Sequence, residues 1–153
     1  MPVTPAGVLF ADVTTEPIDT GAMMARVASA SMGAVVSFLG VVRDHDTPGR
    51  GEVVRLDYEA HPSAADVMRG VCSDMAASHP ESVIAAVHRI GSLNVGEPAL
   101  VVVVAARHRR EAFDTSRDVV DAVKARLPVW KHQFFTDGSD EWVGLGDVGP
   151  VLG

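Results

Sequence analysis

The chain has 153 residues, of which 47% are apolar and 22% charged, and its formal net charge is −7. This length fits a single domain with a sizeable core, and the negative charge argues against binding to nucleic acid or to an anionic membrane. Cys72 is the one cysteine, which excludes an intrachain disulfide and a cysteine-rich metal site. The N-terminal residues lack the pattern of a signal peptide, and the longest apolar run, residues 99–106, is too short to cross a membrane. We therefore expect a cytoplasmic protein.

The first half of the chain alternates short β-branched runs with polar turns and two helical patterns. Asp19 or Thr20 can cap the first helix, and Ser63, which follows Pro62, can cap the second. Gly40 lies inside a strand pattern and predicts a bulge or a close backbone approach. The predicted elements are a strand at 8–13, a helix at 20–30, strands at 34–43 and 53–61, and a helix at 64–78. We expect the strands at 34–43 and 53–61 to form a hairpin across the polar loop 44–52.

The second half contains the most apolar strand and the longest helix. Residues 100–106 form a continuous β-branched run, which is typical of a central strand buried on both faces. The helix that follows starts near Arg109, ends before Pro128 and carries an apolar stripe: Ala112, Phe113, Ser116, Val119, Val120, Val123 and Leu127. The remaining predicted elements are a strand at 82–90, a turn at 94–98, a strand at 129–135 and a short strand at 141–143.

Several neighbouring strands have the spacing of hairpins, although helices alternate with strands. This pattern favours an α+β sandwich, with helices packed on one side of a mainly antiparallel sheet, over a doubly wound parallel sheet. Residues 1–143 are predicted to form one domain, and the Gly-rich residues 144–153 a flexible tail.

Lysine is rare in this chain. Of 13 Lys and Arg residues, only Lys124 and Lys131 are lysines. A Lys amine can act as an acid, a base or a nucleophile, which an Arg guanidinium does not do, so the two positions are candidates for chemistry. Lys124 follows Val120 by four residues and should border the apolar stripe as a half-buried amine. The alternative interpretation is that both are ordinary surface lysines.

His108 and Arg109 lie where the central strand passes into the helix N-terminus. Free backbone N–H groups and the helix dipole favour an anion there, and Arg109 adds a donor suited to phosphate or carboxylate. The alternative is that these side chains are simply solvated. Arg109 and Lys124 are separated along one helix by roughly 22 Å, so a site using both must be shared across a dimer.

Two other residues have mainly structural interpretations. Cys72 borders a helical stripe and is predicted to be a core thiol, since nothing nearby would lower its pKa. His88 alternates with apolar residues in its strand and is expected to be structural or exposed. No metal site and no cofactor are predicted, because no acidic or histidine pair has a metal-ligand spacing.

Five ordered motifs carry a family resemblance: GAVVSFLGVVRDH at 33–45, LDYEAHP at 56–62, HRIGSLNVGE at 88–97, ARHRREAF at 106–113 and VDAVKARLPVWKHQ at 120–133. With them the chain resembles the large, catalytic subunit of molybdopterin synthase, from about Gly33 to Val143. The resemblance implies an α/β hammerhead-type fold and a homodimer. It also implies that each copy binds a small ubiquitin-like sulfur-carrier subunit, whose C-terminal Gly-Gly is a thiocarboxylate, to give a heterotetramer.

The activity implied by the resemblance is a sulfurtransferase that converts cyclic pyranopterin monophosphate to molybdopterin in molybdenum cofactor biosynthesis. Carried over by position, Lys124 and Lys131 are the catalytic lysines. The implied substrate-binding residues are Val41, Val42, Arg43, His108, Arg109, Lys131, His132 and Gln133, with His108 and Arg109 donated by the dimer mate. Val41 replaces a common Lys of the family, and His132-Gln133 a common Arg-Glu.

Two other functions remain open from the sequence. One is a non-catalytic dimeric module that binds a phosphorylated ligand or an acidic tail through the same basic residues. The other is a small phosphoesterase using His108, which the absence of a partner carboxylate motif disfavours. Lys124 separates the first alternative from the enzyme, because only the enzyme needs a titratable amine there.

Overall fold

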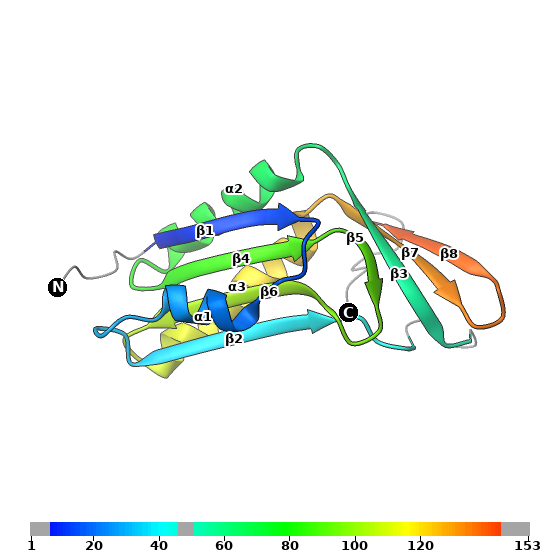
Figure 1. The fold of residues 1–153 in the computed structure, drawn as a ribbon. Coiled ribbons are helices and arrows are strands. Elements are labelled where there is room, and N and C mark those ends of the chain that lie inside the picture. Colours follow the sequence, from blue (N-terminus) through cyan, green and yellow to red (C-terminus); the bar gives the residue numbers. More distant parts are fainter. Residues whose placement is uncertain (1–6, 46–50, 145–153) are drawn as a thin grey trace.

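The computed structural model describes residues 7–45 and 51–144. This part of the chain forms three helices and eight strands (Figure 1). In chain order they are β1 (Gly7–Thr14), α1 (Thr20–Val27), β2 (Ala34–Val41), β3 (Val53–Ala60), α2 (Ala64–Ser78), β4 (Val83–Arg89), β5 (Gly91–Asn94), β6 (Pro98–Ala106), α3 (Arg109–Arg126), β7 (Val129–Phe135) and β8 (Asp140–Gly144).

The strands form two four-stranded sheets with the orders β1-β4-β6-β2 and β5-β3-β7-β8. Only the β1–β4 pair is parallel among the described strands. The second sheet continues the molecule beyond one end of the first, where β2 ends and β6 begins (Figure 1). The prediction of an α+β fold with mainly antiparallel strands is confirmed.

The predicted hairpin between residues 34–43 and 53–61 is wrong. β2 pairs with β6, whereas β3 pairs with β5 and β7 in the other sheet. An alternating or β-branched pattern fixes which face of a strand is buried, but not which strand lies beside it. The predicted irregularity at Gly40 is confirmed, since the β2–β6 register shifts between Gly40 and Val41. β5 was not predicted, because its four residues begin with Gly91, whose φ is +95°.

The first sheet has a helix layer on each face. α2 and α3 cover one face over residues such as Ile84, Val102 and Val104, while α1 covers the other over Val101 and Val103 (Figure 1). The prediction that the helices pack on one side of the sheet is therefore correct for α2 and α3 and wrong for α1, which packs on the opposite face. β6 is buried on both faces as predicted, because it lies between β4 and β2 and beneath helices on each side.

A small third core joins the two sheets. Leu56 and Tyr58 of β3 pack there with Val42 and Leu93. The His88 ring meets the Tyr58 ring edge-on at 4.8 Å between centroids, and its Nδ1 donates to the Arg89 carbonyl at 2.7 Å. Burial lowers the pKa of His88 to about 4, so it is a neutral structural residue at neutral pH.

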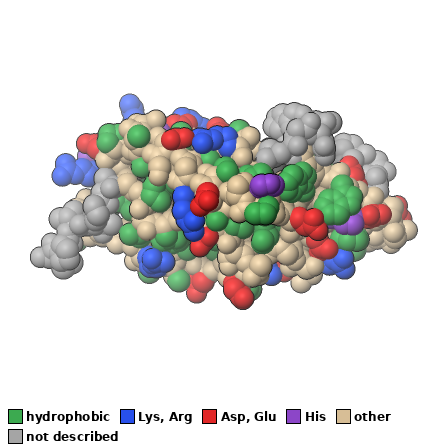
Figure 2. Space-filling model, turned by 90° about the horizontal axis from the view of Figure 1, so that it is seen from above, with side chains coloured by type: hydrophobic (Ala, Val, Ile, Leu, Met, Phe, Trp, Pro, Cys, Tyr) green, Lys and Arg blue, Asp and Glu red, His purple; other side chains and the backbone are tan. Residues whose placement is uncertain are grey.

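The surface has mixed charge. On the face shown in Figure 2, acidic and basic side chains are interspersed, with no broad region of one sign. The predicted tail, residues 144–153, lies outside the described residues except for Gly144. That residue is buried at the end of β8.

Asp19 is the N-cap of α1, as predicted, and its side chain accepts a hydrogen bond from the Ala22 N–H at 3.0 Å. Replacing Asp19 with alanine should lower the free energy of unfolding by about 1 kcal/mol, because that N–H loses its acceptor. Urea denaturation measures the change. The exposed Glu16→Ala variant is the matched control and should unfold like the original chain. An equal loss in both variants would contradict the role of the cap.

Candidate active site

Lys124 lies in the last turn of α3 and is half-buried, as predicted. Val120 and Val123 on the same helix pack into the core beneath the first sheet, so the lysine borders the apolar face. Its Nζ atom is 5.9 Å from the centroid of the Phe38 ring on β2. At this distance the ring offers its electron-rich face to the ammonium.

Lys131 and Gln133 lie on the inner face of β7. Alternation along this strand buries Val129, Lys131, Gln133 and Phe135. Lys131 is 7% exposed and lies opposite Tyr58 on β3, while Gln133 is 1% exposed and lies opposite Leu56. The Gln133 Nε2 group has no acceptor among the described residues. A buried amide donor without an acceptor is costly, so it is well suited to a ligand that supplies one.

His132 lies on the opposite face of the same strand. Its ring stacks on Trp142 at 4.2 Å between centroids, and its Nε2 is hydrogen-bonded to the Asp140 carboxylate. The predicted segment Lys131–Gln133 therefore presents two side chains to the inner face and one to the outer face. His132 can line the same site as its neighbours only through its backbone.

Val41, Val42 and Arg43 lie where β2 ends. Val42 is buried in the core that joins the sheets, where its N–H donates to the Glu97 carbonyl at 3.0 Å and its carbonyl accepts from Gly96 at 2.7 Å. These bonds fix the backbone, from which the exposed Arg43 projects. The end of β2, the last turn of α3 and β7 all lie at the junction of the two sheets (Figure 1). We call this region the junction site.

His108 and Arg109 lie at the other end of the first sheet. His108 is the N-cap of α3 but makes no capping bond with its side chain, and both residues are exposed. Ala34 pairs with Ala106, so this end is separated from the junction site by the whole length of β2. Eight residues of strand and fifteen residues of helix each correspond to about 22 Å. Within one chain the structure therefore does not bring these two residues to Lys124.

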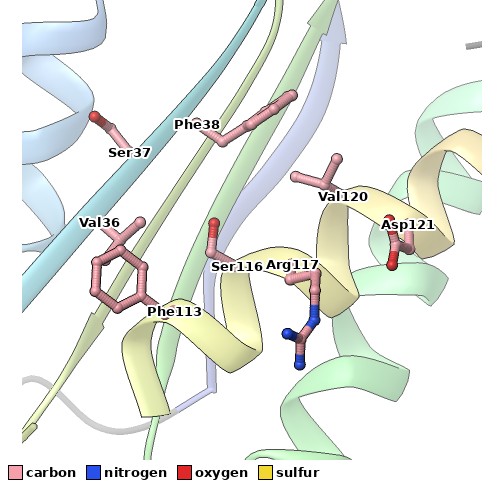
Figure 3. Close-up of a pocket in the computed structure, with 8 residues that line it drawn as sticks. All are labelled: Val36, Ser37, Phe38, Phe113, Ser116, Arg117, Val120 and Asp121. Carbon is pink, nitrogen blue, oxygen red and sulfur yellow. The ribbon is translucent and has the colours of Figure 1, made fainter. Parts of the chain in front are cut away.

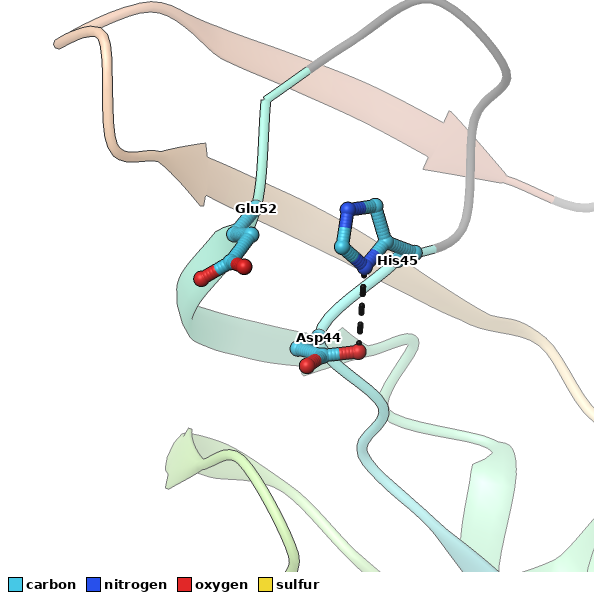
Figure 4. A group of neighbouring side chains, drawn as sticks. All are labelled: Asp44, His45 and Glu52. Atoms are coloured by element: carbon cyan, nitrogen blue, oxygen red, sulfur yellow. Dashed lines mark hydrogen bonds and ion pairs between the residues drawn. The ribbon is translucent and has the colours of Figure 1, made fainter.

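Three side chains beside Arg43 have an arrangement that could hold a metal ion: Asp44, His45 and Glu52 (Figure 4). One ligand atom from each lies within 4.8 Å of the others. All three are exposed, and the His45 Nδ1 contact with Asp44 at 3.1 Å already accounts for part of this proximity. The sequence-based expectation of no metal site stays a prediction.

Sequence reasoning missed the ring that covers Lys124. Phe38 lies on β2, and its proximity to α3 follows only from the β2–β6 pairing, which the strand pattern did not predict. Cys72 is buried in the main core as predicted, and burial raises the pKa of its thiol to about 12. A reactive role for this thiol therefore has no support in its surroundings.

No helix among the described residues is long and apolar enough to cross a membrane. The family model described as MoaE protein matches residues 13–126. Molybdopterin synthase catalytic subunit 1 of Mycobacterium tuberculosis is 37% identical over 88% of this chain and 90% of the relative. The catalytic subunit of Pyrococcus abyssi is 43% identical over 78% of this chain and 80% of that protein.

Among solved structures, the crystal structure of molybdopterin synthase from Staphylococcus aureus has a TM-score of 0.80. It is 27% identical and covers 86% of this chain and 95% of its own. The fold and the site thus define an α+β protein with two lysines and an arginine around the junction of two sheets. More specifically, the chain belongs to the family of molybdopterin synthase catalytic subunits, which transfer sulfur in molybdenum cofactor biosynthesis.

Proposed function

We propose that this chain converts cyclic pyranopterin monophosphate to molybdopterin, using sulfur from the C-terminal thiocarboxylate of a small ubiquitin-like carrier subunit. The observation that carries the proposal is the junction site. Lys124 and Lys131 come from the consecutive elements α3 and β7, and the fold brings them to the same region as Arg43 at the end of β2, which lies far earlier in the sequence. The proposal includes the cytoplasmic location and single-domain organisation expected from the sequence.

The three cations have different surroundings, which suggests different roles. Lys124 is half-buried on a helix and is proposed to act as the acid–base group in sulfur transfer, or to capture the acyl carbon of the carrier. Lys131 is almost fully buried on a strand, so its amine is held in place and suits substrate binding. Gln133, on the same face, offers its amide donor to the substrate.

The substrate phosphate needs further donors. Arg43 is exposed at the edge of the junction site and can bind phosphate with two parallel hydrogen bonds. His108 and Arg109 lie at a helix N-terminus, which favours anions, and are proposed to reach the junction site of a second copy. Val41 and Val42 line the site through their backbone. Two copies, each with one carrier, make the proposed heterotetramer.

The test is an assay of the purified chain with a thiocarboxylated carrier and cyclic pyranopterin monophosphate, with the dithiolene product as readout. We expect product with this carrier and none with the same carrier ending in an ordinary carboxylate. Arg126→Ala removes a cation from the same helical turn as Lys124 and should leave the rate within about twofold, because Arg126 pairs with Asp74 at 2.8 Å on the outside. Carrier binding without product would instead support a binding module.

A further inference from the structure

An ion pair lies where the first sheet meets the second. Arg89 is the last residue of β4, and Glu97 is the residue before β6. Nη1 of Arg89 donates to Oε2 of Glu97, and Nη2 donates to the Ser92 carbonyl on β5 at 3.4 Å. The other carboxylate oxygen of Glu97 accepts from the Asn94 N–H at 2.9 Å. The Arg89–Glu97 pair therefore ties β5 and the turn that follows it, residues 94–97, to the end of β4. We call these residues the β5–β6 turn.

The Arg89–Glu97 pair is charged and partly buried. The two side chains are 12% and 33% exposed. The Asn94 N–H, followed by Arg89, lowers the pKa of the Glu97 carboxyl, so Glu97 is a carboxylate at neutral pH. The Nε group of Arg89 is buried and has no acceptor among the described residues. Burying a charged pair and an unsatisfied donor costs free energy, so net stability is a poor reason for this arrangement. A need for one fixed geometry of the turn explains it better.

The β5–β6 turn holds the backbone of Val42. The last pair of the β2–β6 ladder joins Val41 to Pro98, which has no N–H to donate. The turn continues the pairing beyond this point. The Val42 N–H donates to the Glu97 carbonyl at 3.0 Å, and the Val42 carbonyl accepts from the Gly96 N–H at 2.7 Å. The path of the chain after β2 thus depends on the turn.

Arg43 is the next residue, and its side chain is exposed. The carbonyl of Asp44, which follows it, accepts from the Val53 N–H of β3 at 2.7 Å. Arg43 therefore lies between two backbone positions that are held by hydrogen bonds, Val42 on the β5–β6 turn and Asp44 on β3. These two contacts set the point from which the guanidinium extends.

β2 carries two groups of the junction site, and their backbones are held in different ways. Phe38 and Val120 line one groove between β2 and α3 (Figure 3), and the Phe38 ring lies 5.9 Å from Nζ of Lys124. Regular pairing with Val102 on the central strand holds the backbone of Phe38. Arg43 lies beyond this regular pairing, so the β5–β6 turn supplies the support that β6 does not.

We propose that Arg89 and Glu97 are positioning residues, which act through the β5–β6 turn to fix the point from which Arg43 reaches the substrate phosphate. The inference rests on the proposed function, in which Arg43 binds this phosphate. A guanidinium binds phosphate through two parallel hydrogen bonds, and these require a fixed direction of approach. Loosening the turn therefore weakens substrate binding and leaves the later steps unchanged.

The first experiment measures whether the Arg89–Glu97 pair holds the turn. Glu97→Gln keeps the size of the side chain and one acceptor but removes the negative charge that Arg89 contacts. We expect the amides of Val42 and Gly96 to exchange with deuterium about tenfold faster in this variant. This increase should exceed any change at Val102, whose exchange reports unfolding of the whole chain. Equal exchange of the two turn-bonded amides in both chains overturns the proposal.

The second experiment measures substrate binding through kinetics, with the thiocarboxylated carrier at saturation. Glu97→Gln should raise the KM for cyclic pyranopterin monophosphate about fivefold and leave kcat within about twofold. Added to Arg43→Ala, the same substitution should change KM by less than about twofold, because no guanidinium is left to position. Calorimetry replaces KM with Kd where turnover is too slow to measure. An equal rise in both backgrounds would show a general structural effect and overturn the proposal.

A second variant and a matched control complete the test. Arg89→Lys keeps the charge but does not bond Ser92 and Glu97 together, so it should raise KM in the same way. Asp57→Asn is the control, because Asp57 is 30% exposed, pairs with Arg55 and accepts from the Ser92 hydroxyl on the outer face of the second sheet. It should keep KM within about twofold of the original value. A rise as large as that of Glu97→Gln would overturn the proposal.

Failure of the proposed function gives a different result from failure of the positioning role. If the original chain makes no dithiolene, the proposed function fails and the role of the Arg89–Glu97 pair toward the substrate fails with it. If the original chain is active, an unchanged KM or unchanged amide exchange in Glu97→Gln contradicts the positioning role alone.

Discussion

Replacing Lys124 with arginine should lower the rate of dithiolene formation about 100-fold or more while carrier binding stays within about threefold. Arginine keeps the positive charge, but its guanidinium does not exchange a proton or attack a carbon at neutral pH. Losing a positioned acid–base group typically costs this much or more. Single-turnover assays with preloaded thiocarboxylated carrier measure the rate, and calorimetry measures the binding.

The surroundings of Lys124 differ from those of a neighbouring cation on the same helix, which provides a control for the loss of charge. Its amine lies near the Phe38 ring and is half-buried, whereas Arg126, two residues later, is exposed and paired with Asp74. Arg126→Ala therefore controls for general loss of charge at this end of α3. A near-normal rate in the Lys124→Arg variant would contradict the proposed role of the amine, but it would not contradict the membership of the chain in the family.

Lowering the pH from about 6.5 to about 4 should cost the fold about 3 kcal/mol through His88 alone. Burial lowers the pKa of this imidazole in the folded chain from 6.5 to about 4, so in this range the unfolded chain binds the proton and the folded chain does not. Protonation then favours unfolding, at about 1.4 kcal/mol per pH unit. Stability should rise with pH across the window and level off above it.

The measurement is urea denaturation at several pH values, with His88→Asn as the comparison. Asparagine offers an amide donor for the Arg89 carbonyl, which Nδ1 serves in the original chain, and it does not titrate. The variant should show a weaker dependence on pH over the same window, whatever its absolute stability. Parallel curves for the two chains would show that His88 is not the source of the effect.

Local patterns predicted the individual elements well, and the structure explains why. α2 and α3 have continuous apolar stripes and a proline two residues after their last residue, so their extent follows from local pattern, although neither Ser63, the predicted cap of α2, nor His108 makes a capping bond with its side chain. β6 has an unbroken β-branched run, which suits only a strand buried on both faces. The partners of β2 and β3 could not be predicted, because pairing depends on contacts between residues far apart in sequence.

The same distinction holds for the candidate site. The half-buried position of Lys124 follows from its place beside the stripe of α3, so the sequence predicts it. The Phe38 ring near that amine, the inward position of Gln133 and the outward position of His132 depend on how the sheets are assembled. The roles of the site residues stay predictions until they are measured.

The topology also constrains when the sheets can form as the chain leaves the ribosome. Among the described strands, β1 pairs only with β4, β2 only with β6, and β3 only with β5 and β7. None of these partners begins before Val83. More than half of these 153 residues must therefore be synthesised before the first two strands can pair. Until then β1, β2 and β3 remain unpaired. Such delayed pairing slows folding and leaves unpaired strand edges open to aggregation during synthesis.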